Sequence, residues 1–301
     1  MIDDYVNTLI ENLPTTASPQ RLDLVLDGGI FNGSYLVGAL YFLKEMERRN
    51  MVRIERISGC SIGSIVAFMY YINALDLMPS LYDTVHREFK RTMTLRTITQ
   101  LKTHLKDRIP DDICARVNDK LFVCYHDIKR RKKVVKSTYQ NADDIIETLI
   151  RSCYVPLLVD SRILYKRRYM DGLNAFIFPK ESNKKILHME LFGYDKWMYA
   201  LNVKNEKTNF HRILSGLLDI HGFFIKQSNT SMCSYVDQWS LLHKAHCSLK
   251  QWIEMLLVYA MYLLQYVKPH VPKDLADHVL VKIVAKMSVD IFSILLETYC
   301  L

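Results

Sequence analysis

The sequence predicts an α/β fold in which a mainly parallel sheet lies between layers of helices. Strand-like apolar runs alternate with helix-like segments from residue 20 to about residue 200, and this alternation is typical of a parallel sheet covered on both faces. Two of the strands also run through a glycine-containing turn directly into a helix, over residues 22–49 and 53–68. A chain of 301 residues can form one large domain of this kind with an appendage.

The first strand–turn–helix unit begins with the apolar strand Leu22–Leu26 and continues through the turn Asp-Gly-Gly-Ile-Phe-Asn-Gly at 27–33. Residues 34–49 then place apolar side chains at three- and four-residue steps, as an amphipathic helix does. A glycine-paired loop that opens a helix presents several backbone N–H groups to an anion. That anion is a phosphate or the oxyanion of an acyl intermediate. An ordinary βα turn is the alternative interpretation of this loop taken alone.

The second unit carries the pentapeptide Gly59-Cys60-Ser61-Ile62-Gly63, a G-x-S-x-G motif between a strand and an apolar helix. In a nucleophile elbow of this type the glycines let the chain turn sharply, so that the serine hydroxyl leaves the sheet beside the positive end of the helix. The Cys60 side chain should turn away from the substrate and serve packing.

A third motif follows a strand-like segment at 163–169, where Asp171-Gly172 stands within Tyr169–Asn174. A glycine-rich βα loop, a G-x-S-x-G elbow and an Asp-Gly in this order resemble the patatin-like phospholipase family, whose serine–aspartate dyad has no histidine. The resemblance extends from Leu22 to Pro179, and Ile150–Leu158 looks like the family's serine-and-proline segment.

The resemblance implies a three-layer α/β/α patatin-like sheet and the activity of a lipid acyl hydrolase of the phospholipase A type. Ser61 would be the nucleophile and Asp171 the base of a reaction that forms an acyl-enzyme, with no metal and no organic cofactor. The backbone amides of Gly28, Gly29 and Ile30 would form the oxyanion hole. Four further glycines would support these motifs: Gly33, Gly59, Gly63 and Gly172.

The chain departs from the family pattern at three positions. Ile30 stands where the loop usually has a third glycine, Asn32 replaces its Arg or Lys, and Leu173 replaces the small residue after the Asp-Gly. If the third loop position requires positive φ, a β-branched residue is poorly suited to it. Ile30 and Asn32 favour the alternative of a catalytically weak or inactive patatin-like scaffold that binds lipid, whereas the retained Ser61 with its flanking glycines and Asp171 favours catalysis.

A Ser-His-Asp triad is a rival interpretation of the same serine and aspartate. Seven histidines follow Asp171 in the sequence, and none of them sits in a recognisable loop after a strand: His188, His211, His221, His243, His246, His270 and His278. His243 and His246 with Cys247 lack a second pair of ligands, so we expect no metal site there.

The net charge of +8 favours anionic partners. We expect a phospholipid or another acyl-ester lipid as substrate, peripheral contact with an anionic membrane surface, and no nucleic acid. The basic run 129–133 is interpreted first as a solvated hairpin tip and second as a lipid-headgroup patch. The apolar run 255–267 is shorter than the ~20 residues that a transmembrane helix needs. The aromatic residues of 252–266 are interpreted as core, with an acyl-chain pocket as the alternative.

We expect a cytoplasmic protein, because the N-terminus has no signal-peptide pattern and the seven cysteines contain no C-x-x-C pair. The predicted organisation has an N-terminal helix and linker at 1–19, the catalytic domain at 20–204 and a helical C-terminal region at 205–301. Residues 185–191 and 197–201 are the last predicted strands. Helical signals continue from residue 207 onward, interrupted at Gly222, and this region is expected to pack on the sheet and cover the site.

Overall fold

The computed structural model describes residues 2–14, 18–192, 200–203 and 206–267, together with the single positions 287, 290, 291 and 294. Its centre is a seven-stranded sheet in the order β4-β3-β2-β1-β6-β7, with β5 paired to β3. The four central strands β3, β2, β1 and β6 are parallel, and the pairings of β4, β5 and β7 are antiparallel. The prediction of a mainly parallel sheet is thus confirmed. The strands are β1 Gln20–Leu26, β2 Val52–Cys60, β3 Leu121–Asp127, β4 Lys132–Lys136, β5 Tyr169–Asp171, β6 Lys185–Met189 and β7 Cys233–Tyr235.

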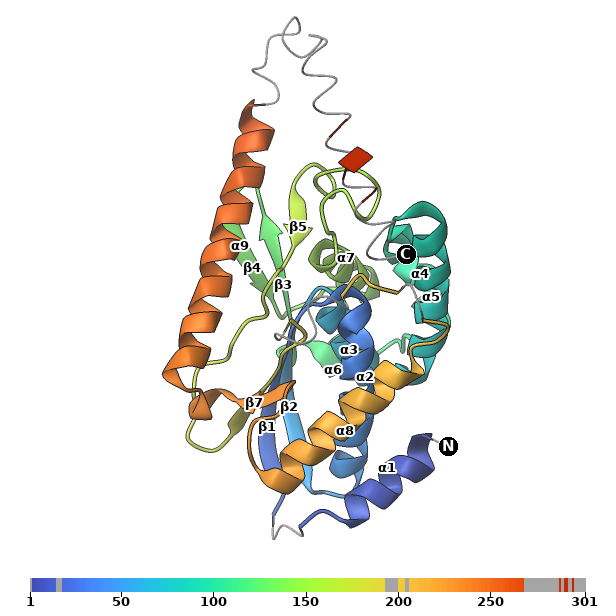
Figure 1. The fold of residues 1–301 in the computed structure, drawn as a ribbon, viewed down its shortest axis with the longest axis vertical. Helices are drawn as coiled ribbons and strands as arrows, with labels where there is room; N and C mark the ends of the chain where they lie inside the picture. The colour runs from blue at the N-terminus through green and yellow to red at the C-terminus, as the bar shows by residue number, and fades with distance from the viewer. Residues whose placement is uncertain are drawn as a thin grey trace, which may run out of the picture.

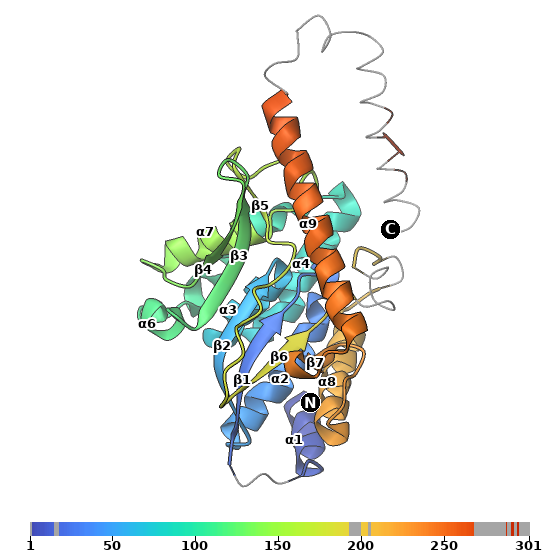
Figure 2. The same cartoon turned by 90° about the vertical axis from the view of Figure 1, so that its left-hand side faces the viewer.

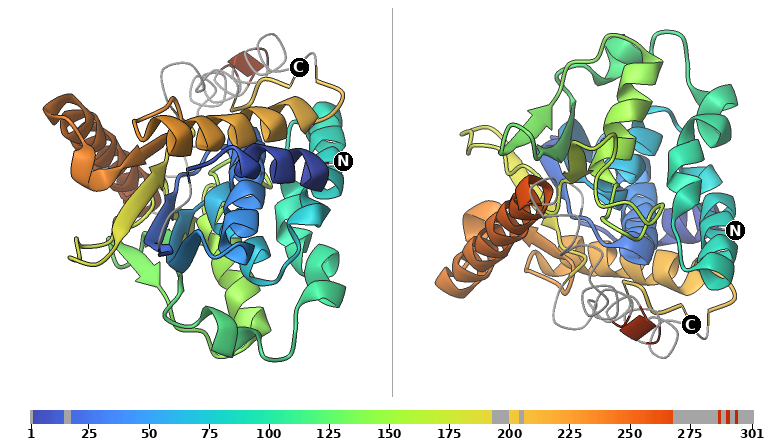
Figure 3. Two further views of the ribbon diagram at one scale, coloured as in Figure 1. Left: turned by 90° about the horizontal axis from the view of Figure 1, so that it is seen from below. Right: turned by 90° about the horizontal axis from the view of Figure 1, so that it is seen from above.

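Helices cover the two faces of this sheet unequally (Figures 1 and 2). Helices α2, α3 and α8 share a large apolar core with the strands on one face, whereas α9 crosses the other face (Figure 3). The helices are α1 Ile2–Glu11, α2 Gly33–Arg48, α3 Ile62–Tyr71, α4 Met78–Thr92, α5 Leu101–Leu105, α6 Ile113–Val117, α7 Ala142–Ser152, α8 Phe210–Lys226 and α9 Leu241–Val267; short 3-10 turns include η1 Ile30–Asn32 and η3 Arg96–Gln100. Among the described residues, no helix is both long enough and apolar enough to cross a bilayer.

Because side chains alternate along each strand, the strands contribute apolar residues to the cores on both faces of the sheet. On β1, Leu22, Leu24 and Leu26 point into the large core, while Val25 points to the opposite face. There it packs with Cys60 and with the extended segment 172–178, which lies on the sheet beside α9. Since Cys60 is buried in this apolar cluster, its predicted packing role is confirmed, and burial raises the pKa of its thiol well above the ordinary value.

Several predicted elements agree with the structure and others do not. The basic run 129–133 does form the tip of the β3–β4 hairpin, as predicted. The predicted strand at 163–169 is wrong, because residues 165–169 form a tight turn with positive φ at Lys166 and Arg167. Of this segment, Tyr169 begins β5, and Tyr165 forms an isolated bridge with Tyr169 across the turn.

The region after residue 207 is not helical throughout. Strand β7 interrupts it and extends the sheet antiparallel to β6, although three residues give too short a pattern to recognise. Gly222 lies inside α8 rather than ending it. Of the strand predicted at 197–201, residues 197–199 lie outside the described residues, and Ala200 and Leu201 form a turn.

Candidate active site

The G-x-S-x-G motif forms a sharp turn between β2 and α3. Ser61 has φ 49° and ψ −132°, a backbone conformation that non-glycine residues rarely adopt. A Cβ on Gly59 would lie 2.7 Å from the backbone of Gly63, and a Cβ on Gly63 would lie 2.6 Å from the carbonyl oxygens of Leu26 and Asp27. Only glycine at both positions lets the start of α3 lie this close to β1, and this contact fixes where Ser61 stands.

The segment after α7 connects the elbow to Asp171. The Ser61 N–H donates to the Ser152 hydroxyl at 3.0 Å, and that hydroxyl donates to the Cys124 carbonyl at 2.6 Å. Two residues further, the Tyr154 carbonyl accepts a hydrogen bond of 3.0 Å from the Asp171 N–H. The serine of the Ile150–Leu158 segment therefore holds the backbone of the predicted nucleophile.

Asp171 is buried at the end of β5, with 3% of its surface exposed. Burial raises the pKa of its carboxyl to about 6, opposed first by the Ser61 hydroxyl and then by the Leu173 N–H, which donates to Oδ1 at 2.8 Å. The Oδ2 atom has no hydrogen bond of regular geometry within the described structure. The two members of the predicted dyad thus lie together, and the carboxyl keeps one oxygen free to accept a proton.

The predicted oxyanion loop lies directly against the elbow. A Cβ on Gly28 would lie 2.9 Å from the Cβ of Ser61, so a larger residue here would push the loop away. In the part of the chain that the structure describes, the N–H groups of Gly28, Gly29 and Ile30 donate to no protein acceptor. The N–H of Ile62, at the start of α3, is equally free there, and the residue after the nucleophile is a usual oxyanion donor in such elbows. Ile62 was not predicted as an oxyanion donor, although it directly follows Ser61 in the G-x-S-x-G motif.

A sequence model of the patatin-like phospholipase family matches residues 24–174, the span that contains the loop, the elbow and Asp171. The chain belongs to this family.

Two curated relatives from Mus musculus also match this patatin-like protein. 1-Acylglycerol-3-phosphate O-acyltransferase Pnpla3 is 25% identical over 162 residues, which are 51% of this chain and 39% of the relative. Omega-hydroxyceramide transacylase is 24% identical over 157 residues, 48% of this chain and 26% of the relative. The chain therefore spans less than half the length of either relative. Among solved structures, VipD from Legionella pneumophila aligns with a TM-score of 0.32 and 12% identity, over 58% of this chain and 50% of VipD.

The family's loop pattern is altered here in ways that the structure accommodates. Ile30 has φ 48°, so the position does require the left-handed region, and a β-branched residue occupies it. Its side chain packs against the cluster that contains Phe31, Tyr82 and Phe89. Apolar packing therefore offsets a backbone cost of roughly 1–2 kcal/mol.

Asn32, in the position of the family's basic residue, links the loop to a buried cation from far along the chain. Its amide donates to the Leu191 carbonyl at 3.0 Å, and Arg212 of α8 donates to its Oδ1 at 2.7 Å. Arg212 is fully buried and forms an ion pair of 2.6 Å with Glu206. Arg212 of α8 thus supplies, through Asn32, a positive charge next to the loop where the family has a basic residue in the loop itself. No local signal in the sequence indicated Arg212.

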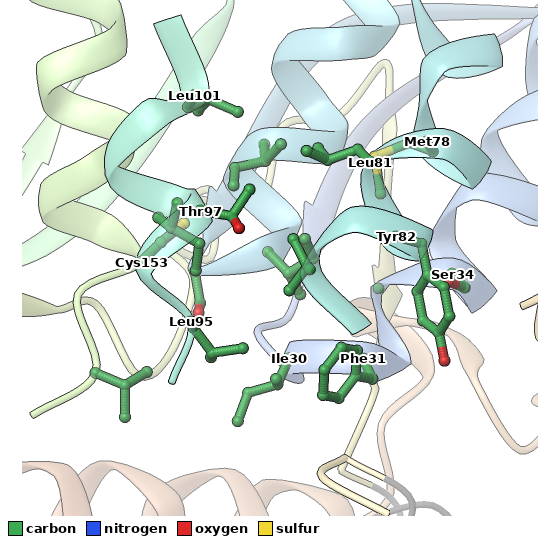
Figure 4. A pocket seen from close by; sticks show the side chains of 17 residues that line it. Ile30, Phe31, Ser34, Met78, Leu81, Tyr82, Leu95, Thr97, Leu101 and Cys153 are labelled. Atoms are coloured by element: carbon green, nitrogen blue, oxygen red, sulfur yellow. The ribbon is translucent and has the colours of Figure 1, made fainter. Parts of the chain in front are cut away.

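An apolar pocket opens beside Ser61. Its walls come from the loop at Ile30, from α3, from α4 and from the segment around η3 and α5 (Figure 4). Most of the lining side chains are aliphatic, among them Ile65, Met78, Leu81, Val85, Ile98 and Leu101. Residues 252–266, the alternative predicted acyl-chain pocket, do not line the pocket beside Ser61.

In the described part of the chain, no histidine considered for a triad has a hydrogen bond or ion pair with Ser61 or Asp171; His221 packs against Phe42 and His243 against Trp239. Three of those considered contact other groups: His188 faces Asp27 at 3.4 Å, His246 faces Glu190 at 3.2 Å, and His211 faces Glu206 at 3.2 Å. His270 and His278 lie outside the described residues. Within the described part of the chain, no cluster of three or more His, Cys, Asp or Glu side chains could hold a metal.

Two buried residues near Asp171 were not identified from the sequence. His126 on β3 pairs its Nε2 with Glu254 of α9 at 2.6 Å, and Glu254 also accepts a hydrogen bond of 2.7 Å from Asn174. Both residues influence the pKa of Asp171, His126 lowering it and Glu254 raising it. Glu254 lies 80 residues from Asn174, and sequence separation of this size hides such a contact from motif analysis.

Proposed function

We propose that this protein is a lipid acyl hydrolase of the phospholipase A type that works through Ser61 and Asp171. The observation that carries the proposal is the position of Ser61, held in a strained elbow between a buried carboxyl and an apolar cavity. The apolar pocket suits an acyl chain, and the amides of the 28–30 loop, which donate to no acceptor among the described residues, suit an oxyanion.

In the proposed reaction the Ser61 Oγ attacks the ester carbonyl while Asp171 accepts the hydroxyl proton. The carbonyl oxygen becomes an oxyanion that the N–H groups of Gly28, Gly29 and Ile30 stabilise. The C–O bond to the leaving alcohol then breaks, and Asp171 returns the proton to that alcohol. Water, deprotonated by the same carboxylate, cleaves the acyl-enzyme and restores Ser61. An aspartate with pKa about 6 is a better base at neutral pH than one with an ordinary pKa.

The substrate would be an acyl-ester lipid, taken from an anionic membrane surface by a protein that binds there peripherally. A formal charge of +8 supports such a surface as partner. The relatives' names describe acyl transfer, which supports a second candidate, in which an alcohol of another lipid replaces water as the acyl acceptor.

An active-site serine probe tests the chemistry directly. We expect the wild type to be labelled and Ser61→Ala not to be labelled, with Ser64→Ala as the matched control, because Ser64 lies one turn further along α3 and hydrogen-bonds only the Ser61 carbonyl and Cys153. Wild-type protein that binds lipid but resists the probe would favour the inactive-scaffold alternative. If labelling succeeds, the products formed from a long-chain ester with and without an added lipid alcohol distinguish hydrolysis from transfer.

A further inference from the structure

Helix α9 buries Glu254 and partly buries Lys250, whereas most of its large apolar residues are exposed, unlike the residues of an ordinary surface helix. Glu254 has 6% of its surface exposed, whereas Trp252 and Leu256 have 62% and 67% exposed. The exposed stripe continues along the helix at three- and four-residue steps through Leu249, Ile253, Tyr259 and Leu263. The expectation that the aromatic residues of 252–266 form core is therefore wrong for this stripe. An exposed apolar surface of this extent marks an interaction site.

The inner face of α9 is held by ion pairs, so the orientation of the helix is fixed. Lys250 pairs with Glu190 and, at 3.4 Å, with Asp27, the residue that precedes the oxyanion loop. Glu254 pairs with His126 at 2.6 Å and with Lys133 at 2.8 Å. Burial raises the pKa of Asp27, but the attraction of His188 and Lys250 outweighs it, and its pKa lies below the ordinary value. Because these charged groups face inward, the apolar stripe must face outward.

Two exposed basic loops lie beside the C-terminal half of α9. The guanidinium of Arg131, at the β3–β4 tip, lies 3.8 Å from the ring centre of Tyr262. In the turn at 162–167, the Arg167 carbonyl accepts a hydrogen bond of 2.8 Å from Gln265. Three cations of these loops form no ion pair with the described residues: Lys129, Lys132 and Arg167.

These features gather at the end of the sheet where Ser61 lies. The β3–β4 tip follows the carboxyl end of β3, which is parallel to β2 and therefore ends beside the elbow. Helix α9 starts after β7 near the amino end of β6 and runs toward that same end (Figures 1 and 2). An apolar stripe flanked by unpaired cations is typical of a helix that lies in the headgroup region of an anionic bilayer.

We propose that residues 252–267 of α9, with the basic loops 129–132 and 162–167, form a docking surface for an anionic lipid bilayer. The proposal rests on the proposed function, since docking here brings the Ser61 end of the sheet to the lipid that the site would cleave. Trp252 and Tyr259 suit the bilayer interface, where their rings have both apolar and polar neighbours.

Charge reversal tests the basic loops on the full chain, with co-sedimentation on phosphatidylserine-containing and on pure phosphatidylcholine vesicles. We expect Lys129→Glu/Lys132→Glu/Arg167→Glu to weaken binding to the anionic vesicles by about 100-fold or more at low salt. The matched control, Arg53→Glu/Lys180→Glu/Lys226→Glu, changes the net charge by the same amount. These three residues are also exposed, but Arg53 and Lys180 lie at the amino end of the sheet and Lys226 at the end of α8. This control should weaken binding far less.

The apolar stripe is tested with Trp252→Ser/Leu256→Ser, compared with Leu218→Ser/Ile225→Ser on the exposed side of α8. We expect only the α9 pair to reduce binding by about 10-fold or more at high salt, where the electrostatic part is screened. Serine-probe labelling without vesicles should be unchanged in all four variants, which shows that the site is intact.

The docking proposal is overturned if the control variants weaken binding as much as the test variants, or if no variant changes it. It is also overturned if the α9 variant dissociates a dimer and leaves vesicle binding unchanged, because the stripe would then bind a second copy of this chain. If wild-type protein binds anionic vesicles through these residues yet resists the serine probe, the proposed function fails while the docking surface stands.

Discussion

The elbow at 59–63 and the loop at 27–33 lie side by side, but their geometry is specified differently. The elbow takes its shape mainly from its own glycines: Gly59 and Gly63 allow the close contact of α3 with β1, and Ser61 takes φ 49° within its own turn, although its N–H also donates to Ser152. The loop is held by distant partners, since Phe31 donates to the Ala200 carbonyl at 3.1 Å and Asn32 is bonded to Arg212 at 2.7 Å.

This difference explains how the loop can depart from the family pattern while the elbow does not. A substitution in the elbow meets backbone atoms, which cannot move without moving the strand. The loop glycines Gly29 and Gly33 face the side chains of Leu191 and Ile62, and Asn32 is bonded to the Arg212 side chain, and side chains can change together with the loop. We infer that Ile30, Asn32 and Arg212 form one altered set rather than three separate defects.

Breaking the elbow should have the largest effect. Gly63→Ala places a Cβ 2.6 Å from two backbone oxygens, so we expect a loss of about 3 kcal/mol or more in the free energy of unfolding, together with loss of probe labelling. Gly222→Ala is the matched control, because nothing lies within 4 Å of its Cβ position. That substitution inside α8 should stabilise by about 0.5–1 kcal/mol. Equal effects of the two substitutions in chemical denaturation would contradict the steric argument.

The same contrast explains which parts of the structure could be predicted from the sequence and which could not. The parallel sheet, the elbow and the position of Asp171 follow from short motifs and from the alternation of strands and helices, all of which are local. Arg212, Lys250 and Glu254 were missed because each acts through contacts with residues more than 50 positions away in the sequence. Strand β7 was missed because three residues carry too little pattern.

Removing the Arg212 side chain that holds the loop should have the next largest effect on stability. Arg212→Met removes the buried partner of Glu206 and of Asn32, and we expect it to cost about 3 kcal/mol. Arg212→Lys retains the charge but cannot donate to both partners with the same geometry, so it should cost less while still lowering turnover. The free energies of unfolding and kcat are the measurements. A variant with unchanged kcat would show that Arg212 supports folding without positioning the loop.

The buried carboxyl of Asp171, which contacts the elbow at Ser61, gives a prediction that depends on pH. Because burial raises the pKa of Asp171 from 3.8 to about 6, the folded protein holds this proton more tightly than the unfolded chain does. Stability is therefore lost as pH rises from about 4 to about 6, and the whole cost of about 3 kcal/mol is present above that range. Asp171→Asn should stabilise the protein by up to this amount at pH 8 and by almost nothing at pH 3.5.

The same substitution should abolish turnover, and in the wild type kcat/KM should rise with pH to a plateau above about pH 6, as the carboxylate base forms. Thermal unfolding at the two pH values and a pH–rate profile check both statements. An Asn variant that is destabilised at pH 8 would show that hydrogen bonding to the carboxylate outweighs its desolvation.

The smallest effect on stability is expected for substitution of Ile30, because relief of backbone strain and loss of side-chain packing nearly cancel. Glycine would relieve a left-handed conformation that costs a β-branched residue roughly 1–2 kcal/mol. It would also lose the side chain that packs near Phe31 and would add chain entropy to the unfolded state, costs of similar size. We expect Ile30→Gly to change stability by less than about 1 kcal/mol and to leave kcat equal or higher, with Ile30→Val behaving as the wild type. A large fall in kcat for glycine alone would mean that the isoleucine side chain, not the backbone, aims the loop amides at the oxyanion.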